Sequence, residues 1–256
     1  MAAAAVLAIA LGTMAHQAAH VVVGAMAGGR PTLVTSTGFE GYWSGLRNAG
    51  VLALGASGSL AHGILALAGW LVFRRGVRAP TTGTAVGWIL FVTNAWIPTA
   101  YLTVSPVLGA GDWMPVLDRF RQLGPMRASA AVTGLFVAAQ LWKGTVQTLA
   151  RLVGNGAADA RAARARSITR WAWAAGGLVA VLAAVRDPAG PVHAVPIAAA
   201  ATFGSTWPIL LAARAVAGAP VPGAPLRLER SIPVIVLAVV SMVVLVAYFG
   251  PGVRLD

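Results

Sequence analysis

Long apolar segments alternate with short polar ones along the whole chain. Each apolar segment is close to the length of about 20 residues that a helix needs to cross a bilayer. The pattern therefore predicts an all-α fold, a polytopic transmembrane bundle of about seven helices: Ala2–Met26, Gly50–Phe73, Thr84–Val107, Ala128–Leu149, Ile168–Val185, Val192–Ala213 and Ile232–Phe249.

Composition supports a membrane protein. Of 256 residues, 58% are hydrophobic and only 10% are charged, whereas a soluble domain has about 25% charged residues. No basic segment precedes the first apolar segment, so we expect that segment to remain as a membrane helix rather than to be cleaved as a signal peptide. The bias toward alanine and arginine favours a bacterial source, and hence a bacterial cell membrane.

Basic residues are concentrated in alternate connections. Arginines follow the second, fourth and sixth predicted spans, whereas the other connections are closer to neutral. Cytoplasmic loops are enriched in Lys and Arg, so this distribution predicts the N-terminus inside and the C-terminus outside. It also explains the net charge of +12 without nucleic-acid binding, which we do not expect.

The first predicted outer loop, residues 27–48, is polar and rich in Thr, Gly and aromatic residues. Residues 33–37 have the composition of a short strand, and Gly38 would turn the chain after it. A strand edge at the membrane surface could receive an extended peptide. The alternative is a surface loop with Tyr42 and Trp43 at the membrane interface.

Two histidines four residues apart, His16 and His20, lie in the first apolar segment. On a helix they are only about 40° apart around the axis, so both imidazoles leave the same face. Two imidazole nitrogens one turn apart can share a zinc ion. Ionisable groups within a membrane segment are costly to bury and are therefore candidates for function.

Asp112 is the candidate for a third metal ligand. It follows the third predicted span directly, after the Gly109-Ala110-Gly111 turn. Spans one and three run in the same direction, so both histidines and Asp112 are expected toward the same side of the membrane. The alternative is a helix-capping or interfacial aspartate.

Two more polar residues lie in the neighbouring spans. His62 in span two and Asn94 in span three are candidates to support the metal ligands from a second layer. For His62 the alternative is a hydrogen-bonded interior histidine.

These features resemble the intramembrane zinc metallopeptidases of the site-2 protease type. The resemblance rests on His16-Gln17-Ala18-Ala19-His20, the Gly28-Gly29-Arg30 turn, a second span rich in small residues, Asn94, and Gly111-Asp112-Trp113. It implies a metal-binding core of three spans in residues 1–125, with His16, His20 and Asp112 as zinc ligands and a transmembrane peptide as substrate or partner. Residues 126–256 would form an additional bundle of four spans.

The chain departs from that family at Gln17, where the family has the glutamate of HExxH that acts as general base. A glutamine amide has no ionisable proton and cannot act as a base at neutral pH. The resemblance therefore implies a metalloprotease homologue that binds a divalent metal but is catalytically impaired. Whether the protein is an enzyme stays open at this point. Neither a substrate nor an oligomeric state follows from the sequence.

Two other hypotheses remain open. In the first, the protein is a non-enzymatic transporter or interaction protein, and Gln17, His62, Asn94 and Gln140 line a polar path through spans one to four. In the second, His16 and His20 are only hydrogen-bonded within the bundle and have a purely structural role.

Overall fold

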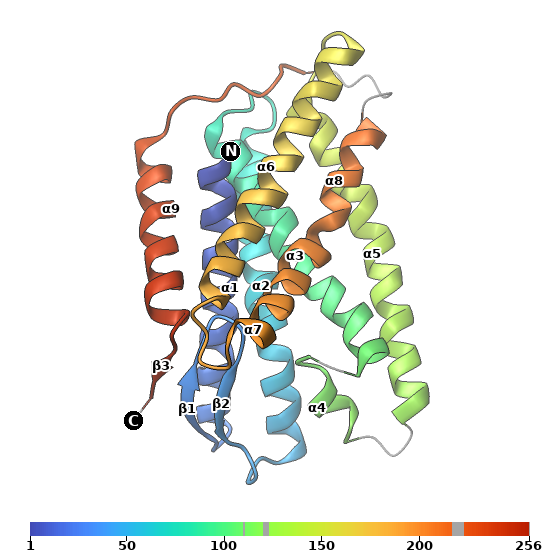
Figure 1. Ribbon diagram of the computed structural model, residues 1–256. Helices are drawn as coiled ribbons and strands as arrows, with labels where there is room; N and C mark the ends of the chain where they lie inside the picture. The colour runs from blue at the N-terminus through green and yellow to red at the C-terminus, as the bar shows by residue number, and fades with distance from the viewer. Residues whose placement is uncertain (110, 120–122, 217–222, 256) are drawn as a thin grey trace.

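The protein is a helical bundle with one small sheet at one end (Figure 1). The computed structural model describes residues 1–109, 111–119, 123–216 and 223–255. In chain order the elements are α1 (Ala2–Met26), β1 (Arg30–Val34), β2 (Phe39–Tyr42), α2 (Asn48–Gly76), α3 (Thr82–Leu108), α4 (Met114–Leu117), α5 (Leu123–Val153), α6 (Ala158–Ala184), α7 (Pro191–Ala199), η1 (Ala200–Gly204, a π-helical stretch), α8 (Ser205–Val216), α9 (Ile232–Val244), η2 (Leu245–Phe249, also π-helical) and β3 (Val253–Arg254).

Six helical segments among the described residues are long and apolar enough to cross a membrane. They are α1, α2, α3, α6, the continuous segment Pro191–Val216 and the segment Ile232–Phe249. The predicted all-α membrane bundle is confirmed. The fourth predicted span exists as α5, a helix of 31 residues, but its polar side chains make it less apolar than the six.

The arginine-rich connections gather at one end of the bundle. Figure 1 shows the N-terminus at the same end as the α2–α3, α5–α6 and α8–α9 connections, and the C-terminus at the opposite end. The α2–α3 and α5–α6 connections are both joined to the segment before α9, because Arg227 N donates to Pro80 O at 2.9 Å and Asn155 N donates to Gly223 O at 3.0 Å. The segregation of arginines found in the sequence is therefore also a segregation in space.

The sheet lies at the other end and confirms a short β element in the first predicted outer loop. Its strand order is β2-β1-β3, and both pairings are antiparallel. The first strand begins earlier than expected, at Arg30, and ends at Val34, because residues 35–38 form the turn: Thr35 N donates to Gly38 O at 2.8 Å. The third strand comes from the C-terminus and was not predicted.

Helix α1 lies within the bundle, with α2, α3, α6 and α9 packed against it. Its first half is rich in alanine, and Ala5, Ala8 and Ala10 are fully buried. Small side chains allow neighbouring helices to approach closely, which is how helices associate in a membrane. This packing holds α1 in a fixed position and therefore fixes the direction of the two histidines farther along it.

Helix α3 is fixed by close contacts on two sides. Toward α2, Gly87 and Gly69 lie opposite each other, and a Cβ on Gly69 would come within 2.7 Å of Gly87 O. Toward α5, the indole nitrogens of Trp88 and Trp96 donate to the hydroxyls of Thr148 and Thr145 at 2.9 and 3.0 Å. Interhelical hydrogen bonds of this kind stabilise helix association in lipid.

The proposed division at residue 125 falls near the start of α5. Helices α6 and α9, which follow it, pack directly against α1. The later helices therefore help to support the helix that carries the histidines. The division into a metal-binding core and an added bundle stays a prediction.

Candidate metal centre

The two histidines of α1 point into the protein and meet each other. His16 and His20 are 6% and 1% exposed, and their Nε2 atoms are 3.1 Å apart. The rings meet edge to face, with centroids 4.7 Å apart. The helical spacing therefore places both imidazoles on one buried face, as the sequence predicted.

Asp112 reaches the same point from the corner after α3. Helix α3 ends at Leu108, and its C-cap residue Gly109 adopts the left-handed conformation with φ of 69°; Gly111 has φ of 96°. Residues other than glycine rarely adopt such backbone angles. The resulting turn brings Asp112 Oδ2 to 3.1 Å from His16 Nε2 and 3.5 Å from His20 Nε2.

The three candidate ligand atoms form a triangle of the size that a metal ion requires. Its sides are 3.1, 3.1 and 3.5 Å, whereas two ligands about 2.0–2.1 Å from a tetrahedral zinc are about 3.3 Å apart. A point about 2 Å from all three atoms therefore exists on either side of their plane. His16, His20 and Asp112 are also the group that the described residues offer as candidate metal ligands.

His20 is oriented by α2. Its Nδ1 lies 2.8 Å from Leu54 O and 3.0 Å from Ser57 Oγ, and that hydroxyl itself donates to Leu54 O at 2.7 Å. Donation from Nδ1 to the carbonyl leaves the lone pair on Nε2, which faces Asp112. Phe39 of β2 stacks on the other side, with ring centroids 4.5 Å apart and an interplanar angle of 17°. The arrangement is the one by which metal-binding histidines are usually fixed.

The His16 ring packs against a glycine of α2. A Cβ on Gly58 would come within 2.6 Å of His20 Nε2 and closer still to the His16 ring. Tyr101 stacks on the His16 ring with centroids 6.0 Å apart. Within the described residues, His16 Nδ1 is buried without a hydrogen-bond partner.

His62 and Asn94 lie beside His16, as the sequence suggested. The His62 ring is 5.2 Å from the His16 ring, and its Nδ1 lies 2.7 Å from Asn94 Oδ1. The amide nitrogen of Asn94 donates to Leu90 O at 3.0 Å, which fixes the orientation of the amide. Both residues are buried and therefore form a rigid layer behind His16.

The Asp112 carboxyl is charged at neutral pH. Burial alone would raise its pKa, but the two imidazoles beside it outweigh burial and hold the pKa of Asp112 well below its usual range. Asp112 Oδ2 is buried and faces the two Nε2 atoms at 3.1 and 3.5 Å. A cation among the three atoms would be bound by all of them, so the residues present fit a divalent metal.

Gln17 borders a small cavity beside the histidines. The cavity has a volume of about 40 Å³, and its walls include His16, Gln17, His62 and Thr37. The Gln17 side chain is 5% exposed, and its Oε1 has no hydrogen-bond partner among the residues described. The space is sufficient for about one water molecule, next to the position at which the resembling family has its glutamate.

Of the four residues in the polar path of the alternative hypothesis, three lie together and one lies apart. Gln17, His62 and Asn94 are buried together near the histidines. Gln140 is instead exposed on α5. The fourth predicted member of the path therefore lies outside this buried cluster.

Several residues of the site were missed in the sequence. Gly58 is one of several small residues of span two, and the sequence does not distinguish it from Gly55, Ser59 or Gly63. A Cβ on Gly63 would meet no atom within 4 Å, so the close face of α2 instead passes through Gly55, Gly58 and His62. Phe39 gave no signal, because its contact depends on how the hairpin folds over α1.

Comparison with protein-family models, with curated proteins and with solved structures finds no match for this chain in any of the three.

Proposed function

We propose that the protein is an intramembrane zinc metalloprotease homologue of the site-2 protease type whose catalysis is impaired. His16, His20 and Asp112 would hold the metal. The observation that carries the proposal is the convergence of two Nε2 atoms and one carboxylate oxygen within 3.5 Å of one another. When bound, zinc supplies a Lewis acid that polarises a peptide carbonyl.

The residue at position 17 explains the proposed impairment. Gln17 lies in the cavity next to His16, where a glutamate could take a proton from an attacking water molecule. The Gln17 amide can orient a water molecule by hydrogen bonding but cannot accept its proton at neutral pH. Loss of positioned acid–base catalysis typically lowers a rate by about 10²–10⁴-fold.

A membrane peptide would be the substrate or binding partner. The cavity of about 40 Å³ is too small for a peptide segment, so peptide binding requires the elements around it to separate. The turn between β1 and β2 is held by Thr37 Oγ1, which donates to Asp187 Oδ2 at 2.6 Å. Separation of the hairpin from the end of α6 would therefore break this hydrogen bond.

The arginine-rich end would face the cytoplasm of a bacterial cell. This orientation is supported by the three arginine-rich connections gathered at the end that holds the N-terminus (Figure 1). The candidate metal centre would then lie toward the outer side, near the sheet.

Removal of a ligand tests metal binding. Substitution of a residue that supports a metal ligand lowers metal affinity by about 10–100-fold. Loss of a ligand itself should have a larger effect, so we expect His16→Ala and Asp112→Ala to lower zinc affinity by more than about 100-fold. Wild-type protein should contain about one zinc per chain, measured by elemental analysis after purification in a zinc-replete buffer. The matched control is His193→Ala, because His193 is exposed at the start of α7. Equal zinc contents in all four proteins would contradict the proposal.

A further inference from the structure

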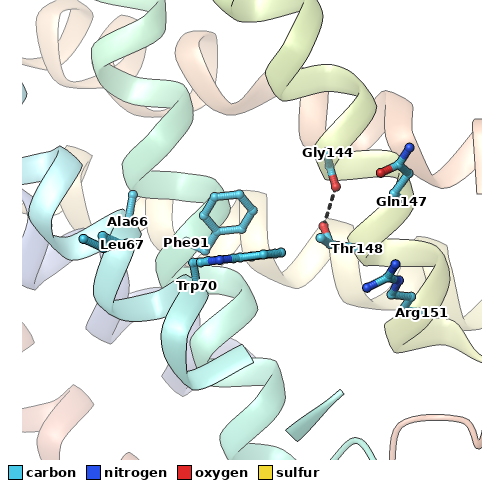
Figure 2. A pocket seen from close by; sticks show the side chains of 8 residues that line it. All are labelled: Ala66, Leu67, Trp70, Phe91, Gly144, Gln147, Thr148 and Arg151. Atoms are coloured by element: carbon cyan, nitrogen blue, oxygen red, sulfur yellow. Dashed lines mark hydrogen bonds between the residues drawn. The ribbon is translucent and has the colours of Figure 1, made fainter. Parts of the chain in front are cut away.

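A second pocket lies between α2 and α5, on the surface of α3. It has a volume of about 370 Å³, within the range of about 300–1,000 Å³ typical of small-molecule sites. Both α2 and α5 pack against α3, so α3 forms the floor. Figure 2 shows the residues that line it: Ala66, Leu67, Trp70, Phe91, Gly144, Gln147, Thr148 and Arg151.

The two walls of this pocket differ in chemistry. The wall from α2 and α3 is apolar: Trp70 and Phe91 contact each other with ring centroids 5.4 Å apart, and Leu67 is 57% exposed. Two further residues of α2, Leu60 and Ile64, continue the exposed apolar surface away from the pocket. The wall therefore offers an extended surface for hydrocarbon.

The wall from α5 is polar and carries a positive charge. Gln147 and Arg151 are exposed and face the pocket from the end of α5 (Figure 2). The hydroxyl of Thr148 is already used, since it donates to Gly144 O at 2.7 Å. None of the ion pairs among the described residues involves Arg151, so its guanidinium has no carboxylate partner there.

One end of the pocket reaches the arginine-rich end of the bundle. Arg151 is in the last turn of α5, and Arg74 and Arg75 are in the last turn of α2. These turns are at the arginine-rich end of the bundle (Figure 1). An apolar groove that ends at a cation near the membrane surface has the complementary shape and charge for a lipid with an anionic headgroup.

We propose that this pocket binds an anionic glycerophospholipid. The phosphate contacts Arg151 and Gln147, and one acyl chain lies against Leu67, Trp70 and Phe91. The lipid fills the space between α2 and α5 and links the helix that orients His20 to the flank of the bundle. The proposal does not depend on the metal centre.

Tryptophan fluorescence with brominated lipids tests this site. Purified protein is reconstituted into vesicles of phosphatidylcholine that contain phosphatidylglycerol with brominated acyl chains, which quench tryptophans in contact with them. Brominated phosphatidylcholine in otherwise identical vesicles is the reference. We expect stronger quenching by the anionic lipid, and we expect Trp70→Phe to abolish the difference although eight of the nine tryptophans remain.

Charge removal provides the second arm. A basic residue near the membrane surface contributes enough to anionic lipid binding that Arg151→Gln should weaken the apparent affinity for brominated phosphatidylglycerol by about five-fold or more. Arg214→Gln is the matched control, because Arg214 is exposed near the end of α8 and does not line the pocket. Equal quenching by both lipids, equal effects of the two arginine variants, or displacement of the lipid by inorganic phosphate would overturn the proposal.

Discussion

The Gln17→Glu variant is expected to hydrolyse peptide bonds about 10²–10⁴ times faster than the wild-type protein, the usual contribution of a positioned acid–base group. The substitution changes one amide to a carboxylate of nearly the same shape. Position 17 already borders the cavity next to His16, so the new carboxylate would lie where an attacking water molecule can be held. The rate is measured with zinc-loaded protein in detergent and fluorescently labelled β-casein, an unfolded substrate.

Two controls separate restored chemistry from contamination or a change in folding. Gln17→Ala should not gain activity, because an alanine supplies no base. The double variant Gln17→Glu/His16→Ala should lose the gained activity, because it lacks one of the candidate ligands. A zinc-loaded, folded Gln17→Glu protein with the wild-type rate would contradict a protease ancestry of the site.

The Gly58→Ala variant is expected to bind zinc more than about 100-fold more weakly than the wild-type protein. The effect should exceed the usual cost of about 10–100-fold for changing one supporting residue, because the added methyl group displaces two candidate ligands at once. The added Cβ would come within 2.6 Å of His20 Nε2 and closer to the His16 ring. To yield, His20 would have to break its hydrogen bond to Leu54 O at 2.8 Å, and His16 would have to leave the position in which its Nε2 faces Asp112. Isothermal titration with zinc measures the effect.

Gly63→Ala is the matched control for this substitution. Gly63 lies in the same helix, and a Cβ there would meet no atom within 4 Å. Both variants exchange one glycine for alanine in α2, so their effects on helix propensity are the same. Circular dichroism should show that both are folded. If Gly58→Ala binds zinc as tightly as Gly63→Ala, the histidines do not pack against α2 as described.

The arrangement of the candidate ligands followed from local rules in the sequence. The four-residue spacing of His16 and His20 places both rings on one helical face, and the structure shows them in contact. The position of Asp112 followed from two helices that run in the same direction and from glycines that end the second of them. Such features depend on helix geometry and chain direction, which do not change with the details of packing.

The contacts around the candidate ligands could not be predicted from these local rules. The contact of Phe39 with His20 and the pairing of β3 with β1 join segments far apart in the chain. The close approach at Gly58 depends on the rotation of α2 about its axis, which small residues at several positions allow equally well. The apolar pattern also treated α5 like the other spans, although its exposed Gln140, Lys143 and Gln147 make it more polar.

X-ray absorption at the zinc edge shows whether His16, His20 and Asp112 share a metal ion. Applied to the zinc-loaded wild-type protein, it reports the type and distance of the atoms bound to the metal. The account predicts two imidazole ligands, with nitrogen and oxygen at about 2.0–2.2 Å, and the loss of one imidazole in His20→Ala. A spectrum without imidazole scattering, or one unchanged in His20→Ala, would contradict a metal shared by α1 and the Asp112 corner.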